Sequence, residues 1–227
     1  MAEGGDGRTT SAGAWGQAVA AVVMVAALGA GLWTFQQASM SAGASPAACT
    51  GGRPEQASGR LSGAQLCAAL NRPDLAGLLG TPGQAVQSAE GGDGSFRPAG
   101  GEEIAAPSAR VEFATYTVEL TATYDDLPVA ASASSLGDGG QRTVLGRPAA
   151  FSSDRTTRIT FRLDGSDAAG RPGVPTRTLT VARDPQDSGG SFDMTLWRAD
   201  GVVPDDAVLL RVAEAVLPTV PGWVAEG

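Results

Sequence analysis

Acidic side chains are the residues of this chain that come closest to a reactive site. Asp125 and Asp126 are adjacent at the end of a segment rich in Thr and apolar residues, and Glu119 precedes them closely. Two carboxylates can perform glycosidase-type acid–base catalysis when a fold holds them at the right separation. Adjacent acids at the end of a strand are more typical of a solvated turn. No catalytic residue is therefore assigned, and a carboxylate-dependent envelope hydrolase remains the alternative function.

Two further pairs of acids have the chemistry of a calcium site. Asp164 with Asp167, and Asp184 with Asp187, offer the oxygen ligands that Ca²⁺ prefers. The spacing of an EF-hand loop is absent, so these pairs are more simply interpreted as polar turns. The sequence predicts no metal ion and no cofactor.

The basic residues are all Arg, because the chain contains no Lys. Guanidinium groups that gather on one sheet would suit phosphate-bearing envelope polymers or lipid headgroups. The alternative is a polar strand face paired with the many Asp and Glu side chains, which contributes little stability per pair. The candidates are Arg155, Arg158, Arg162, Arg177, Arg183 and Arg198.

Several function classes are excluded by composition. The chain has no His, and without Lys and His it can form no Ser-His-Asp triad, no Schiff base and no P-loop lysine. Its formal net charge of −8 argues against nucleic acid as a partner. A binding or sensing module of the cell envelope is the favoured interpretation, with an envelope protein or polymer as a candidate partner, and the carboxylate-dependent hydrolase stays the alternative.

The two cysteines, Cys49 and Cys67, are predicted to form a disulfide. An even number of cysteines is typical of a protein exposed to an oxidising compartment. A bridge across this separation would stabilise the fold by roughly 3 kcal/mol if it acts through the entropy of the unfolded chain. The alternative is a pair of free buried thiols in a cytoplasmic domain.

An uncharged segment near the N-terminus predicts a transmembrane helix at residues 14–35. Trp15 and Trp33 flank its apolar run, and they would lie roughly 27 Å apart in a helix. This separation approaches the thickness of the hydrocarbon layer, and Trp favours both interfaces. The alternative is a cleaved signal peptide ending at the small residues Ala42-Gly43-Ala44, which would make the protein a secreted structural one.

The orientation follows from the few positive charges around this helix. Arg8 precedes it, and no basic residue follows until Arg53. The positive-inside rule then predicts a cytoplasmic tail at residues 1–13 and an extracellular C-terminal domain. The sequence thus indicates a single-pass protein of the cell membrane that contacts the lipid bilayer through residues 14–35.

The rest of the chain predicts an Ala- and Gly-rich tether at 36–60 and one α+β domain at 61–227. Ser62 and Gln65 have the spacing of a capping box, which begins a pair of short helices at about 62–80. A second helical segment is expected at about 204–217, where Asp205 and Asp206 would complement the helix dipole. These helices should pack on an antiparallel sheet.

The sheet is predicted after a long Gly-rich loop at 83–108. Alternating apolar residues favour short strands separated by turn-like segments. In the first of them the alternation changes phase near Ala114-Thr115, which predicts a β-bulge. The expected strands are Arg110–Tyr124, Arg142–Ala149, Thr156–Leu163, Thr176–Arg183 and Ser191–Arg198.

Three segments carry a resemblance to a known group of proteins. They are Leu66–Pro82, Val144–Ala149 and Val216–Trp223, together with the Trp-flanked apolar run. With them the chain resembles actinobacterial single-pass membrane proteins of unknown function, and more distantly actinobacterial extracytoplasmic lipoproteins and kinase sensor domains. It departs from the lipoproteins because Cys49 does not follow a lipobox. The resemblance implies a location at the cell envelope and a non-enzymatic binding or sensing role, and it carries over no catalytic residue.

Overall fold

The computed structural model describes residues 47–53, 59–133, 141–160 and 169–223. The chain divides into two units, Met1–Ser45 and Pro46–Gly227, and every described residue belongs to the second. The cytoplasmic tail expected at 1–13 and the membrane helix expected at 14–35 lie outside the described residues. Within the described ranges, no helix combines the length and the apolar character needed to cross a membrane.

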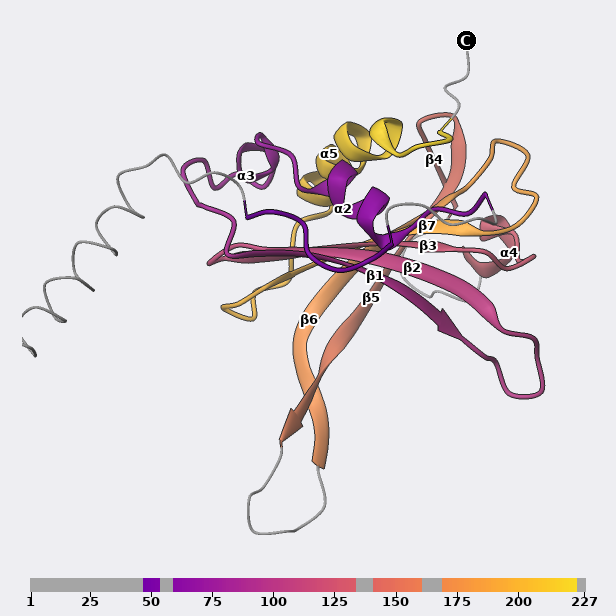
Figure 1. Ribbon diagram of the computed structural model, residues 1–227, viewed down its shortest axis with the longest axis horizontal. Coiled ribbons are helices and arrows are strands. Elements are labelled where there is room, and N and C mark those ends of the chain that lie inside the picture. Colours follow the sequence, from indigo (N-terminus) through magenta and orange to yellow (C-terminus); the bar gives the residue numbers. More distant parts are fainter. Residues whose placement is uncertain (1–46, 54–58, 134–140, 161–168, 224–227) are drawn as a thin grey trace, which may run out of the picture. The chain divides into compact units, whose positions relative to one another are not determined.

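One antiparallel sheet of seven strands organises the domain (Figure 1). Its strands lie in the spatial order β1-β2-β3-β7-β6-β5-β4, so each pair of neighbours is joined by a hairpin except β3 and β7. The predicted α+β class, an antiparallel sheet with short helices, is confirmed. The strands are β1 Ser88–Phe96, β2 Ile104–Glu112, β3 Tyr116–Thr123, β4 Arg142–Val144, β5 Arg147–Thr160, β6 Ala169–Ala182 and β7 Ser191–Arg198.

Helices cover one face of this sheet (Figure 1). They are α2 Gly63–Leu70, α3 Leu75–Leu78, α5 Asp206–Val216 and the short 3₁₀ helix η1 Leu217–Thr219. Helix α2 packs on β1 and β2, and α5 packs on β6 and β7. A fourth helix, α4 Val129–Ala133, packs against Ala150 and Ala182 on the opposite face. The helices predicted at 62–80 and 204–217 are therefore present.

Local signals explain where these helices begin. The capping box of α2 is confirmed, because the Ser62 hydroxyl accepts the Gln65 amide at 3.2 Å and the Gln65 side chain accepts the Ser62 amide at 2.9 Å. Asp205 caps α5 by accepting the Ala207 amide at 2.7 Å. Asp206 in the first turn pairs with Arg177 at 2.7 Å, which ties α5 to β6.

The core lies between the sheet and the helix layer. Alternate residues of the central strands face inward, so Val118 lies opposite Leu196, and Leu120 lies opposite Met194. The helices contribute side chains that are fully removed from solvent, namely Leu66, Leu70, Leu75, Leu209, Val212 and Val216. Each such side chain stabilises the fold by about 1.5–3 kcal/mol through burial.

The Gly-rich loop predicted at 83–108 is wrong over most of its length. Strands β1 and β2 pair from Ser88↔Glu112 to Phe96↔Ile104 and form a long hairpin. Its sequence hides the strand because Gly91, Gly92 and Gly94 have no side chains to show an alternation. At Gly91 a side chain would collide with the backbone of Gly63, and at Gly94 it would lie 3.0 Å from the Ala106 carbonyl, whereas Gly92 has room for one.

Two other strand predictions are corrected by tight turns. Chain reversal at Ala114-Thr115, rather than a bulge, changes the phase of the alternation, and the Phe113 amide donates to the Tyr116 carbonyl at 2.8 Å. The segment expected as one strand at 142–149 is the β4–β5 hairpin, and Pro148 lies within β5 rather than ending a strand. Leu145 and Gly146 make its two-residue turn, both with positive φ.

Helix α2 begins against the backbone of β1. A Cβ atom added to Gly63 would collide with the backbone of Gly92, and one added to Gly91 would collide with the backbone of Gly63. Asp93, the next residue of β1, caps the helix by accepting the Gly63 amide at 2.7 Å. The Gly91–Asp93 run is thus the docking point of α2.

The segment before α2 is held at the same place. Thr50 forms a parallel bridge with Glu90, through hydrogen bonds of 3.1 Å to the Ala89 carbonyl and 2.8 Å from the Gly91 amide. Cys49 and Cys67 are joined by a disulfide with an S–S distance of 2.02 Å, as the sequence predicted. The described part of the tether expected at 36–60 therefore belongs to the folded domain from Ala47 to Arg53.

The β5–β6 hairpin extends beyond the sheet as a two-stranded arm (Figure 1). Residues Thr176–Val181 of β6 pair with β7 on one side and β5 on the other. The pairs from Arg155↔Pro175 outward involve β5 and β6 alone within the described ranges. A register irregularity between Arg155 and Thr157 marks the base of this arm.

The contact between Gly63 and Gly91 generates a prediction about stability. We expect Gly91→Ala to lower the free energy of unfolding by about 1–3 kcal/mol or more. The added methyl group would force the backbones of β1 and α2 apart. Gly92→Ala is the matched control, since its added Cβ would come no closer than 3.9 Å to the Ser108 hydroxyl. Urea unfolding of the full-length chain measures both, and equal stability of the two variants would contradict this account.

The disulfide generates a second prediction. Reduction should lower the free energy of unfolding by about 3 kcal/mol, because it frees a long loop of the unfolded chain. Cys49→Ala should lose a similar amount and become insensitive to reductant, since Cys49 is exposed and the buried Cys67 stays in place. A wild-type chain whose unfolding transition is unchanged by reductant would show that the bridge is absent.

Candidate functional site

A pocket of about 420 Å³ opens beside the N-terminal end of α2. Four separate parts of the domain form it: the approach to α2 with its first turn, the end of β3, the β6–β7 turn region, and the segment after η1. This volume lies within the range of small-molecule sites. The lining residues are Gly59, Arg60, Leu61, Gln65, Tyr124, Arg183, Phe192, Pro221 and Gly222.

Tyr124 is the centre of the pocket's polar side. Its hydroxyl accepts the Leu61 amide at 2.6 Å, which fixes the ring against the entry to α2. Two guanidinium groups lie over this ring, that of Arg183 at 4.1 Å and that of Arg60 at 5.5 Å from the ring centre. Cation–π attraction of about 0.5–2 kcal/mol each holds the two positive charges at one site.

Arg183 is positioned by its neighbours. Gly190 has a φ of +75° and leaves the room that the Arg183 side chain occupies, because an added Cβ would lie 2.8 Å from its Cδ atom. The buried Arg147 donates to the Arg183 carbonyl and stacks over Trp223 at 3.3 Å. Trp223 in turn contacts Phe192, with ring centres 5.8 Å apart, so the expected cover at the end of the core is present.

The charged side chains among the described lining residues of the pocket are both Arg. Arg60 and Arg183 form no ion pair with any described residue, and the buried Nε of Arg183 has no hydrogen-bond partner there. The Gln65 amide uses its oxygen in the capping box, which leaves its Nε2 group for the pocket. No carboxylate stands among the described lining residues. The arrangement fits a ligand group that is negative and rich in acceptors.

The acids singled out in the sequence stand at separate places. Glu119 lies mid-strand in β3 and pairs with Arg110 at 2.6 Å. Asp125 accepts the backbone amides of Leu127 and Gly190, as expected for a solvated turn. The described parts of the chain hold no group of three metal-ligating side chains.

The paired acids in the turns have structural partners. Asp187 caps α4 by accepting the Val129 and Ala130 amides, each at 2.8 Å. Asp184 accepts the hydroxyl and the amide of Ser188 within its own turn. Asp164 and Asp167 lie outside the described residues.

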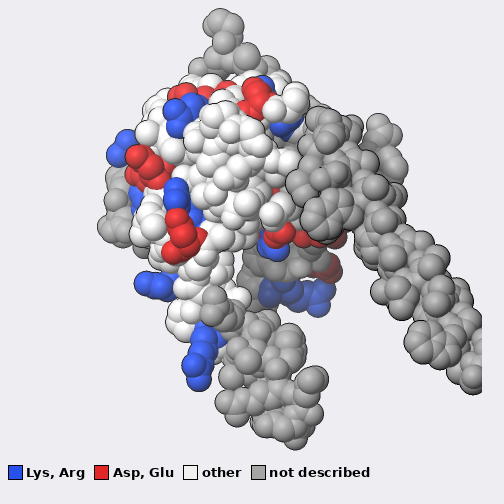
Figure 2. All heavy atoms as spheres, turned by 90° about the vertical axis from the view of Figure 1, so that its left-hand side faces the viewer, with Lys and Arg blue, Asp and Glu red and all other residues white. Residues whose placement is uncertain are grey.

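The candidate Arg residues do not gather in one cluster among the described residues, and two of them instead pair with acids, as the alternative interpretation predicts. Arg177 pairs with Asp206, Arg198 pairs with Asp200, and Arg155 lies on the arm. Arg162 and the Arg158 side chain lie outside the described part. The surface in Figure 2 shows the consequence, because blue and red side chains lie beside each other around an uncharged centre.

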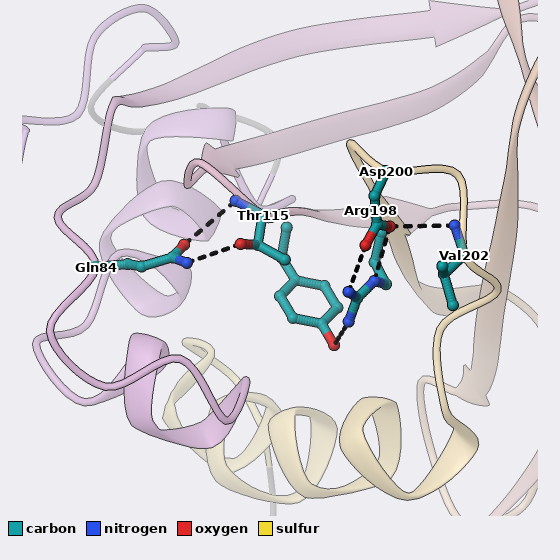
Figure 3. Close-up of polar contacts among 6 residues, drawn as sticks. Gln84, Thr115, Arg198, Asp200 and Val202 are labelled. Atoms are coloured by element: carbon teal, nitrogen blue, oxygen red, sulfur yellow. Dashed lines mark hydrogen bonds and ion pairs between the residues drawn. The ribbon is translucent and has the colours of Figure 1, made fainter.

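A second polar cluster lies at the opposite edge of the core (Figure 3). Arg198 joins Asp200 at 2.6 Å to the Tyr116 hydroxyl at 2.8 Å, and this pairing lowers the pKa of Asp200 to about 2. Gln84 exchanges two hydrogen bonds with Thr115 and holds the chain before β1 against the β2–β3 turn. The bonds of this cluster are made within the protein, so its role is structural.

Asp193 is a half-buried acid of the sheet. It lies on the face of β7 that points away from the main core, where its carboxylate accepts hydroxyl hydrogen bonds from Thr180, Ser191 and Thr123 at 2.6–3.3 Å. Burial raises the pKa of Asp193, and the nearby Asp125 adds to the effect, while the three hydroxyls oppose it. Asp193 therefore binds its proton more tightly in the folded chain than in the unfolded one.

Sequence reasoning missed this pocket. The sequence indicates Arg183 only as a member of a candidate Arg cluster on the sheet. It gives no signal that Arg60, Gln65 or Tyr124 could bind a ligand. These residues are far apart in the chain, and the turns that bring them together are not visible as a motif. The one available signal was the Gly189-Gly190 pair before β7, whose positive φ angles leave room for other chain segments.

The chain belongs to a family of unknown function, DUF6215, which it matches over residues 9–139. This match spans more than half of the chain and includes α2 and the first three strands. No curated protein and no solved structure matches the chain. The expected resemblance to an uncharacterised family is confirmed at this level, and the actinobacterial origin and the membrane anchor stay predictions.

Asp193 generates a prediction about pH. The pKa of Asp193 is higher in the folded chain than its ordinary value of about 3.9. The free energy of unfolding should therefore fall as the pH rises from the ordinary pKa to the raised one. Asp193→Asn removes this titration, so the variant should be more stable than wild type at pH 7, and its advantage should shrink toward pH 4. Thermal unfolding at both pH values measures this, with the exposed Asp126→Asn as control. An advantage of the same size at both pH values would contradict it.

Proposed function

We propose that this protein is a non-enzymatic binding module of the cell envelope, and that its pocket at Arg60 and Arg183 binds an oxyanion such as a carboxylate or a phosphate. The observation that carries the proposal is the pair of guanidinium groups over Tyr124, which form no ion pair with a described residue. No carboxylate stands among the described lining residues of their pocket. A bound oxyanion would supply the negative partner that both groups lack there.

The chemistry of arginine suits this role. Its guanidinium is planar, permanently charged and weakly hydrated, so it binds oxyanions in a fixed geometry. Stacking on Tyr124 limits the rotamers of both Arg side chains before a ligand arrives, which reduces the entropy lost on binding. A protein with an overall net charge of −8 thus presents a local positive site.

The location is part of the proposal. We place the domain outside the cell, attached to the membrane by a helix at residues 14–35 whose N-terminus is cytoplasmic. The apolar, uncharged character of that segment and the pairing of the only two cysteines support this placement.

Anion binding is tested with two variants and a matched control. The full-length chain in a non-ionic detergent is titrated with sodium acetate and with inorganic phosphate, while the ¹⁵N resonances of the Arg Nε groups are followed. Arg60→Gln and Arg183→Gln should each weaken binding by about tenfold or more, because each removes a charge-assisted hydrogen bond. Arg171→Gln, exposed on the arm, should leave it unchanged. Equal binding by all four chains, or none by wild type, would refute the pocket's role.

The location is tested on protein extracted from its native membranes. The intact mass should include residues 1–40 and should rise by about 2 Da on reduction, because one disulfide takes up two hydrogens. A chain that begins near Ser45 would show that the segment is a cleaved signal peptide. A mass that does not change on reduction would argue for free thiols and a cytoplasmic domain.

A further inference from the structure

The oxyanion pocket has a neighbouring hollow on the surface of α2. This second hollow has a volume of about 520 Å³ and follows α2 toward its C-terminal end. It shares the lining residues Gln65 and Pro221 with the first pocket, so the two hollows adjoin, and together they form the groove considered below. The remaining residues of the second hollow are Ala68, Ala69, Arg72, Pro73, Asp74 and Thr219.

The two ends of this groove differ in their free charge. Arg60 and Arg183 at one end carry no ion pair among the described residues, as shown above. Arg72 at the other end is satisfied, because it binds both oxygens of Asp74 and also donates to the Ala215 carbonyl. An elongated ligand would therefore lie in one direction, with its negative end at Arg60 and Arg183.

The middle of the groove has a mixed character. Ala68 on the exposed face of α2, Pro73 and Pro221 form a shallow floor of small apolar groups, with room for short side chains. The Gln65 Nε2 group stands at the junction of the two hollows, where it can donate to a carbonyl. A hydrocarbon chain would gain nothing from this donor and would lie against the Arg72–Asp74 pair, whereas a peptide has the carbonyl that the donor needs.

We infer that the ligand of this groove is an extended peptide segment that ends in a free carboxylate. The inference rests on the proposed function of the Arg60–Arg183 pocket and names the class of its ligand. The terminal carboxylate would lie against the guanidinium groups of Arg60 and Arg183, a backbone carbonyl would accept from Gln65, and short apolar side chains would cover Ala68 and Pro221.

Three probes separate this ligand class from simpler ones. The full-length chain in non-ionic detergent is titrated with acetate, with N-acetyl-trialanine bearing a free carboxylate, and with the same peptide bearing a C-terminal amide. The free acid should bind about tenfold more tightly than acetate, because it adds contacts along the groove. The amidated peptide should bind at least about tenfold more weakly than the free acid, because it loses the charge.

A substitution in the groove provides the second readout. Ala68→Leu fills the second hollow from an exposed helix position, so it should leave folding and acetate binding unchanged and weaken the free-acid peptide by about tenfold. Ala131→Leu, an exposed Ala of α4 on the other side of the sheet, is the matched control and should change neither. An unchanged thermal transition in both variants would confirm that they fold.

The outcomes distinguish the two proposals. If acetate binds as tightly as the peptide and Ala68→Leu has no effect, the groove is not a peptide site, and the oxyanion pocket stands. If phosphate binds well and the peptide does not, the ligand carries a phosphate and the inference is overturned. If the amide binds as well as the free acid, carboxylate recognition is overturned. If no probe binds, the proposed function fails together with the inference.

Discussion

The close approach of α2 to β1 is the constraint on which the rest of the domain depends. Two backbones meet there without side chains between them, at Gly63 and at Gly91. Asp93 then caps the helix, and the Cys49–Cys67 bridge ties the helix to the segment that pairs with β1 at Thr50. Because this contact places α2, it also places the core residues of the helix and the wall of the groove formed by Gln65. A domain with few large apolar side chains thus obtains order from backbone proximity and from covalent closure.

The groove differs from the rest of the described domain in how its charged groups are held. Elsewhere in the described domain, charged side chains mostly find partners within the protein, as Arg177, Arg198 and Arg110 do. At Tyr124 two Arg side chains are held by an aromatic ring instead of by carboxylates, and backbone geometry at Gly190 makes the space for one of them. Because the ring holds the two guanidinium groups without neutralising them, their charge stays available to a ligand. The two positive charges also repel each other at this distance.

How far the sequence predicts this structure depends on the range of each signal. Local signals succeed: the capping box at Ser62, the alternation over 191–198 and the cysteine pair all predict what the structure contains. The β1–β2 hairpin is missed because glycine residues give no alternation of apolar and polar side chains. The sequence also does not show that Gly91 is needed for the contact with α2. The pocket is missed because Arg60, Tyr124 and Arg183 meet only through the order of the strands, with β7 inserted beside β3.

The disulfide would have a mechanical consequence if the proposed anchor held the domain by its N-terminal end. Tension that enters the chain ahead of Cys49 passes through the sulfur atoms directly into the middle of α2 at Cys67. The residues between the two cysteines are thereby shielded, so the backbone bonds of Thr50 and the approach to α2 are not peeled apart one at a time. The force instead acts on α2 as a whole, across the interface that it shares with β1 and β2. Under such tension the wall of the groove on α2 would move together with Cys49, because the sulfur atoms join the two directly.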